Sequence, residues 1–284
     1  MVKEIFVVIL LVQIKREGDF MSVKFCTIAS GSSGNSTFVG TEYTKILIDA
    51  GLSGKRITES LSSLQVMGND IDALFITHEH IDHIKGAGVL SRKFDIPIYA
   101  TQGTWEAMEN QIGKIAPKNK RFVYTEEQCV INDICLQPFS IPHDAKEPVG
   151  YSIATENHKI TLATDLGHIT EEIRKQLVDS EILLLEANHD EELVKSGCYP
   201  LALKQRILGE QGHISNRTAA KLLSEIMSEK LKYVCLGHLS DENNHPHLAY
   251  ETVEKILKKD KIKVGSYLHL DMASRYSRSR VVEL

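Results

Sequence analysis

The chain has 284 residues, a formal net charge of −5 at pH 7 and a pI near 6.2, which exclude a globally basic nucleic-acid-binding protein. Apolar residues make up 42% and charged residues 25%, the composition of an ordinary soluble protein and not of a disordered chain. Five cysteines are scattered without a C-x-x-C pair, which argues against a disulfide framework and favours a reduced, cytoplasmic compartment.

Residues 1–20 are predicted to be a non-core N-terminal extension of a single domain that covers residues 21–284. Residues 5–12 form an apolar run, but a helix needs roughly 20 residues to span a ~30 Å hydrocarbon core, so no membrane span is expected. The small-residue cleavage site of a signal peptide is missing. Because Met21 opens a segment that reads like a natural start, an upstream start codon is the leading explanation, and an added edge strand is the alternative.

From Ser22 onward, hydrophobic periodicity predicts a regular succession of strands and helices. Trp105 falls in one of the helices and is assigned to the core, and residues 114–121 read as an exposed basic loop. In the first half, strands are expected at residues 23–29, 37–39, 46–49, 73–76 and 97–100, and helices at residues 55–64, 84–94 and 104–112.

A run of small residues, Ser30-Gly31-Ser32-Ser33-Gly34-Asn35-Ser36, follows the first predicted strand. Glycines allow close approach of the backbone, and hydroxyls with exposed N–H groups can hold an anion. Ser33 and Asn35 are therefore candidate substrate-binding residues. The alternative is a plain turn, which is the more common use of such strings.

The segment Thr77-His78-Glu79-His80-Ile81-Asp82-His83 brings three imidazoles and two carboxylates directly after a predicted buried strand. These groups are typical ligands of Zn²⁺ and related ions. His78 and His80, two residues apart in an extended segment, can share one metal, and Asp82 and His83 can serve a second where the chain turns. Glu79 is expected to point away. A solvated histidine-rich loop is the alternative, but strand ends are where sites of layered α/β folds gather.

The second half of the chain repeats this arrangement of strands that end in ligand-type residues. Ser215 is a plausible N-cap for the first of its predicted helices. Strands are expected at residues 134–141, 149–155, 159–163, 182–185, 233–236 and 264–270, and helices at residues 219–227 and after Pro246. Four of these strands lead into His143, Asp165, the Glu186-Ala187-Asn188-His189 segment and His238. We therefore expect the two halves to form the layers of one αββα sandwich.

These residues resemble a known family. Taken in order, the ligand-type residues are similar to the complete dinuclear metal set of the metallo-β-lactamase fold: His78, His80, Asp82, His83, His143, Asp165 and His238. Within that superfamily the chain resembles the YycJ/WalJ group of bacterial exonucleases and, more distantly, the tRNA 3′-processing endonucleases. Further support comes from residues 30–36, Ala163-Thr164-Asp165, residues 186–189, Gly212-His213-Ile214-Ser215-Asn216 and Leu236-Gly237-His238. Residues 1–20 have no counterpart in that pattern.

The metal positions predict a specific chemistry. If His78, His80 and His143 hold one ion and Asp82, His83 and His238 hold another, Asp165 can bridge the two. Two ions ~3.5–4 Å apart lower the pKa of a bound water toward about 7 and stabilise both oxygens of an in-line displacement. Asp82 is the best candidate among the ligands to orient the resulting hydroxide. Five imidazoles against two carboxylates favour Zn²⁺, with Mn²⁺ as the alternative.

His213 is the candidate general acid, because the resemblance aligns it with a histidine that tRNA-processing relatives are thought to use for protonating the leaving oxygen. A histidine with a pKa near ~6.5 suits this role at neutral pH, and the helix predicted just after it would favour a phosphate oxygen. The alternative is a histidine that caps a turn. Asn188 and Asn216, which flank this region, are further candidates for substrate binding, and Asn188 and His189 are candidates for supporting His213.

The predicted function is hydrolysis of phosphodiester bonds in nucleic acid, DNA rather than RNA, and the resemblance implies a 5′-to-3′ exonuclease on double-stranded DNA. One alternative is a small-molecule hydrolase such as a glyoxalase II-type thioesterase. Another is a DNA-binding module that does not cleave. Candidate contacts to the phosphate backbone are Lys118, Lys120, Arg121, Arg275, Arg278 and Arg280.

Overall fold

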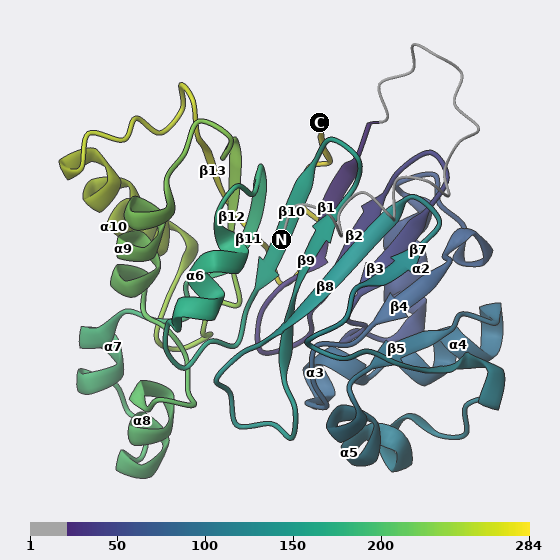
Figure 1. The fold of residues 1–284 in the computed structure, drawn as a ribbon. Helices are drawn as coiled ribbons and strands as arrows, with labels where there is room; N and C mark the ends of the chain where they lie inside the picture. Colours follow the sequence, from purple (N-terminus) through teal and green to yellow (C-terminus); the bar gives the residue numbers. More distant parts are fainter. Residues whose placement is uncertain (1–21) are drawn as a thin grey trace.

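The computed structural model describes residues 22–284, so the predictions for residues 1–20 lie outside the described residues. Two β-sheets pack face to face, and helices cover the outer face of each (Figure 1). This arrangement confirms the predicted αββα sandwich.

The first sheet has seven strands in the order β14-β1-β2-β3-β4-β5-β6. Neighbours from β14 to β3 are antiparallel, and neighbours from β3 to β6 are parallel. The predicted strands at residues 37–39 and 46–49 are β2 and β3, which form an antiparallel pair in which Phe38 lies opposite Leu47. The strands are β1 (Lys24–Ala29), β2 (Ser36–Gly40), β3 (Lys45–Ile48), β4 (Ala73–Phe75), β5 (Ile98–Ala100), β6 (Lys120–Phe122) and β14 (Val282–Glu283).

The second sheet mirrors this organisation, with seven strands in the order β13-β12-β11-β10-β9-β8-β7. Neighbours from β7 to β10 are antiparallel, and neighbours from β10 to β13 are parallel. Its inner strands are largely apolar because they are covered on both faces. The strands are β7 (Cys129–Ile131), β8 (Ile134–Ser140), β9 (Val149–Ala154), β10 (Lys159–Ala163), β11 (Ile182–Glu186), β12 (Tyr233–Gly237) and β13 (His269–Met272).

Helices α2, α4 and α5 cover the first sheet, and α6, α9 and α10 cover the second (Figure 1). Ser215 caps α9 as predicted, since its hydroxyl accepts a hydrogen bond from the N–H of Thr218 at 3.2 Å. Within residues 22–284, no helix combines the length and the apolar character that a membrane crossing requires. The helices are α2 (Gly54–Ser62), α3 (Ile81–Ile84), α4 (Ala87–Phe94), α5 (Gln102–Ile112), α6 (Glu171–Leu177), α7 (Glu191–Ser196), α8 (Leu201–Leu208), α9 (Asn216–Ile226) and α10 (Pro246–Lys259).

Three buried apolar clusters fill the spaces between the four layers. Trp105 belongs to the cluster under α2, α4 and α5 and is only 1% exposed, which confirms its assignment to the core. Phe75 and Tyr151 meet between the two sheets with ring centroids 5.6 Å apart. Leu222 and Leu223 of α9 belong to the cluster on the far side of the second sheet.

The structure corrects three predicted elements. The helix expected at residues 84–94 is divided into α3 and α4, because the N–H of Gly86 donates to the carbonyl oxygen of Ala50 at 2.7 Å and ties the chain to the loop after β3. The strand expected at residues 264–270 begins only at His269, because Gly265 has φ +89° and turns the chain back toward Leu268. The basic segment is only partly a loop, since Lys120–Phe122 forms β6 beside β5.

Candidate metal centre

Side chains with metal-binding chemistry gather where β4, β8, β10 and β12 end. Three of the residues at this edge share a left-handed backbone conformation, with positive φ. Asp49, Asp165 and His238 follow β3, β10 and β12 with φ of 61°, 62° and 55°, in the left-handed region. Asp and His adopt this region more readily than most residues, and such strained positions cluster at functional sites.

The first group contains His78, His80 and His143, whose donor atoms lie within 4.8 Å of one another. Their ring centroids form a nearly equilateral triangle, with separations of 4.6 Å, 5.0 Å and 5.1 Å. Three imidazoles in this arrangement can bind one cation and leave a further coordination position open.

The second group contains Asp82, His83 and His238. One oxygen of Asp82 lies 3.6 Å from Nε2 of His83 and 3.8 Å from Nε2 of His238. Asp165 lies between the two groups, with one oxygen 3.4 Å from Nε2 of His83 and the other 3.7 Å from Nε2 of His143. The seven predicted ligands therefore meet, although they come from four separate parts of the chain.

Buried atoms without partners test whether a cation fits this site. Nε2 of His78, His143 and His238 and one oxygen of Asp165 are buried and have no hydrogen-bond partner among the described residues. Each such atom costs about 1–3 kcal/mol if it stays unsatisfied. Because three of these atoms belong to the two groups of neighbouring donors and the Asp165 oxygen lies between the groups, the donor set fits divalent cations.

The protonation of these side chains reflects their crowding. Burial, and then the neighbouring imidazoles, lower the pKa of His78 well below its usual value, and burial also lowers the pKa of His143, so both rings are neutral as metal ligands must be. Burial alone would raise the pKa of Asp165, but His238 and His83 lower it. Burial alone would lower the pKa of His83, but Asp49 and then Asp165 raise it to about 9. A cation and a proton therefore compete for this imidazole.

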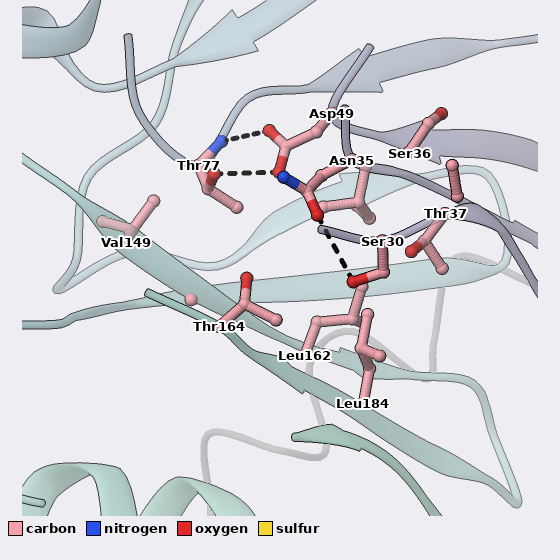
Figure 2. A pocket seen from close by; sticks show the side chains of 13 residues that line it. Ser30, Asn35, Ser36, Thr37, Asp49, Thr77, Val149, Leu162, Thr164 and Leu184 are labelled. Atoms are coloured by element: carbon pink, nitrogen blue, oxygen red, sulfur yellow. Dashed lines mark hydrogen bonds between the residues drawn. The ribbon is translucent and has the colours of Figure 1, made fainter. Parts of the chain in front are cut away.

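Asp49 orients the metal-binding segment, a role that was not predicted. Its carboxylate accepts hydrogen bonds from the N–H of Thr77 at 2.8 Å and from the Thr77 hydroxyl at 2.9 Å (Figure 2). It also contacts Nδ1 of His83 at 2.8 Å, which leaves Nε2 of that ring for a cation. The signal that could have found Asp49 is a carboxylate directly after the apolar run Ile46–Ile48.

We expect Asp49→Asn to lower metal affinity about 10- to 100-fold. The amide can present an N–H to Nδ1 of His83, which would move the ring proton to Nε2 and block that atom as a ligand. Chelator competition on the purified protein measures the effect. Asp70→Asn is the matched control, because Asp70 also accepts a backbone N–H, from Met67, but is exposed and outside the site. Equal affinities in the two variants would contradict this role.

Glu186, the fully buried last residue of β11, is the second residue with an unpredicted role. One of its oxygens contacts Nδ1 of His213 at 2.8 Å and Nδ1 of His238 at 3.0 Å. Its other oxygen accepts backbone N–H groups from Leu166 and Ile214. Burial alone would raise the pKa of Glu186, but the two histidines lower it well below its usual value, so the residue is an anion that orients both rings.

His213 lies beside the metal-binding cluster, with its ring centroid 5.2 Å from those of His143 and His238. Its side chain is 21% exposed, unlike the fully buried Glu186 behind it. The predicted general acid is therefore adjacent to the predicted ligands and open to solvent.

The loop at residues 30–36 braces the site from within. The Asn35 side chain is 6% exposed, contacts Nε2 of His83 at 3.0 Å and donates to an oxygen of Asp82 at 3.3 Å. The Ser30 hydroxyl donates to Asn35 (Figure 2). It also accepts the N–H of His238. Ser30 and Asn35 also line a cavity of about 10 Å³, room for a single water. Ser33 is exposed at the tip of this loop.

The two other predicted substrate contacts are buried and bonded within the protein. Asn188 donates to the carbonyl oxygen of His238 at 2.8 Å, and Asn216 exchanges hydrogen bonds with Asn244. Asn188 thus connects the loops that follow β11 and β12, and Asn216 connects the start of α9 to the loop after β12. The substrate-binding role of all four predicted residues stays a prediction.

One further carboxylate, that of Asp144, reaches the first metal group. One oxygen of Asp144 lies 3.4 Å from Nε2 of His143 and 3.8 Å from Nε2 of His80. The other oxygen accepts a hydrogen bond from Arg206 of α8 at 2.6 Å. Glu79, as predicted, points elsewhere and accepts the N–H of Lys146 at 2.9 Å.

Most of the basic side chains proposed as phosphate contacts are paired with carboxylates. Lys118 pairs with Asp95, and Lys120 pairs with Glu109. Arg275 pairs with Asp241, and Arg280 pairs with Asp271. These pairs reduce the positive charge that any nucleic acid would meet there.

The sequence matches a family model described as "Beta-lactamase superfamily domain" over residues 44–236. The chain is 39% identical over 246 residues to exodeoxyribonuclease YycJ of Bacillus anthracis, an alignment that covers 86% of this chain and 93% of the relative. It is 40% identical over 244 residues to exodeoxyribonuclease WalJ of Streptococcus pneumoniae serotype 2, which covers 85% and 91% of the two chains.

Solved structures share the fold at low sequence identity. The metallo-beta-lactamase fold protein YhfI from Bacillus subtilis superposes with a TM-score of 0.69 at 14% identity, over 93% of this chain and all of that one. The short form of human tRNase Z superposes with a TM-score of 0.60 at 17% identity, over 90% of this chain and 98% of that one.

Proposed function

The chain belongs to the beta-lactamase superfamily, with YycJ and WalJ among its relatives, and from this membership and the site we propose that it is a metal-dependent hydrolase that cleaves DNA. More specifically, we propose a 5′-to-3′ exonuclease that acts on double-stranded DNA. Both curated relatives are named exodeoxyribonucleases, which supports DNA over RNA as the substrate.

The proposed ligand set follows the two groups of donors. His78, His80 and His143 would hold one divalent ion, Asp82, His83 and His238 the other, and Asp165 would contact both. When bound, two ions, Zn²⁺ or alternatively Mn²⁺, supply a water of lowered pKa and stabilise charge on the phosphate. Asp82, whose side chain is 21% exposed, would orient the attacking water.

His213 would protonate the leaving oxygen. With Nδ1 held by Glu186, the ring presents Nε2 as the atom that gives up the proton. The ionised Glu186 stabilises the imidazolium and fixes the direction of the ring. A positioned acid of this kind contributes about 10²–10⁴-fold to the rate.

One observation above all supports a phosphodiesterase. His213 is oriented by a buried carboxylate and is exposed to solvent beside seven converging ligand side chains. A hydroxyl leaving group needs a proton when its bond to phosphorus breaks, and a histidine at that place supplies it.

Substrate selectivity tests the proposal. We expect protein loaded with Zn²⁺ or Mn²⁺ to release mononucleotides from the 5′ end of labelled duplex DNA, with lower rates on single-stranded DNA and RNA. Release from the 3′ end would contradict the polarity. Hydrolysis of lactoylglutathione with inert DNA would identify a glyoxalase II-type thioesterase, and DNA binding without cleavage under either metal would identify a binding module.

We also propose a cytoplasmic location. The five cysteines, all within the described residues, are free thiols, and three of them are exposed or partly exposed. Free thiols at a protein surface are typical of a reducing compartment.

A further inference from the structure

A cleft of about 510 Å³ opens beside His213, between α6, α8 and α9. It is bounded by the loop after β10, by the loop after β11 and by the segment that leads into α9. Its volume falls within the range of about 300–1,000 Å³ that is usual for small-molecule sites. The residues that carry the argument are Leu208, His189, His213, Thr218, Lys221 and Leu222.

The walls of the cleft combine apolar and polar groups. Ile169, Leu208 and Leu222 contribute apolar surface, and Leu208 is 44% exposed although it is a large apolar residue. Two carboxylates also line the cleft, but Glu225 pairs with Arg174, and Glu191 accepts the hydroxyl of Ser215. Because these carboxylates offset the nearby cations, the cleft is better suited to a nucleoside than to a bare phosphate.

His189 gives independent evidence for a ligand. Its ring lines the cleft and is only 1% exposed, yet Nδ1 has no hydrogen-bond partner within residues 22–284. The cleft wall also includes Ser215, the N-cap of α9. A buried donor or acceptor without a partner is costly, so a bound molecule whose polar group reaches Nδ1 would offset that cost.

The position of His213 indicates which part of the substrate would lie in the cleft. His213 lines the cleft and contacts the metal-binding cluster on its other side. If His213 protonates the leaving oxygen, as in the proposed function on which this inference depends, the nucleoside that carries that oxygen must lie on the side of His213. We propose that the cleft binds the 5′-terminal nucleoside of the DNA strand.

The reaction then divides the substrate at this boundary. The water releases one proton to solvent as its oxygen forms a bond to phosphorus, and the bond between phosphorus and the 3′ oxygen of the terminal nucleotide breaks. That oxygen takes the proton of His213 and leaves as a hydroxyl, while the shortened strand keeps the phosphate at its new 5′ end. The released mononucleotide occupies the cleft until it dissociates.

Thr218 and Glu225, two residues of α9 that line the cleft, lie seven residues apart along the helix. Glu225 forms an ion pair with Arg174 of α6, which also lines the cleft. From Thr218 to Glu225, α9 rises about 10 Å. The exposed Lys221 lies between Thr218 and Glu225 along α9, where its ammonium group can contact a 5′-phosphate.

Filling the cleft tests the proposal. We expect Thr218→Trp and Leu208→Trp to lower kcat/KM on 5′-labelled duplex DNA at least about tenfold more than on bis(p-nitrophenyl) phosphate, which has no nucleoside. Calorimetry on the metal-loaded protein should show that both variants bind thymidine 5′-monophosphate at least about tenfold more weakly than wild type. Leu208 is half exposed, so its variant keeps the test valid if Thr218→Trp unfolds.

Lys175→Trp is the matched control, because Lys175 is exposed on α6 but does not line the cleft. It should leave both measurements unchanged. If wild-type protein cleaves DNA and the two cleft variants cleave it equally well, the inference is overturned and the proposed function stands. If wild-type protein does not cleave DNA, the proposed function fails, and unchanged nucleotide binding by the cleft variants would separately overturn the inference.

Discussion

Asp82→Ala is expected to lower the rate of nucleotide release from duplex DNA by about 10³-fold or more. Asp82 is the only carboxylate in the group that contains His83 and His238, so its loss should remove one of the two proposed ions. Stabilisation of the transition state by an ion is worth several kcal/mol, and about 4 kcal/mol corresponds to about 10³ in rate. Initial rates and metal content by atomic absorption measure the two effects together.

Glu79→Gln is the matched control for this prediction. Glu79 lies between two ligands in the sequence, but its carboxylate bonds to the N–H of Lys146 and belongs to neither metal group. This variant should keep the activity and metal content of wild type. Equal loss in both variants would indicate that the segment is merely sensitive to substitution, and a fully active Asp82→Ala would contradict the ligand assignment.

His213→Ala is expected to lower the rate on DNA about 10²–10⁴-fold without loss of metal, because the leaving 3′ oxygen then departs without a positioned proton donor. The loss on bis(p-nitrophenyl) phosphate should be much smaller, since nitrophenolate is a good leaving group that needs no proton. Comparing kcat for the two substrates separates this role from a structural one.

His247→Ala serves as the control, because His247 is an exposed histidine of α10 that pairs with Glu251. It should behave as wild type on both substrates. If His213→Ala loses the same factor on DNA and on the nitrophenyl ester, His213 is not the general acid. A loss of metal in that variant would instead make His213 a ligand.

Much of the fold and of the candidate site was predictable because the signals are local. Buried parallel strands such as β11 carry a continuous apolar run, Ile182 to Leu185 in this case, and His78 to His83 carry their ligand chemistry within one short segment. His143, Asp165 and His238 each follow a strand that periodicity had already placed. The structure then brings these side chains within a few ångströms of the segment.

The supporting residues were less predictable because their roles depend on contacts between distant segments. Asp49 is 34 residues from His83, and Glu186 is 52 residues from His238, yet each pair forms a hydrogen bond. Asn35 read as a residue of an open loop, but it is buried beneath Asp82 and His83. Nothing in the local pattern distinguishes a carboxylate that braces a ligand from one that faces solvent.

The sequence alone therefore determined the secondary structure of most segments and the chemical identity of the ligands. Tertiary structure decided which residues orient those ligands, that His213 faces a cleft, and that α8 brings Arg206 to Asp144. The physical reason is the range of the interactions. Periodicity and ligand chemistry act over a few neighbouring residues, whereas the order of strands in the two sheets decides which strand ends become neighbours.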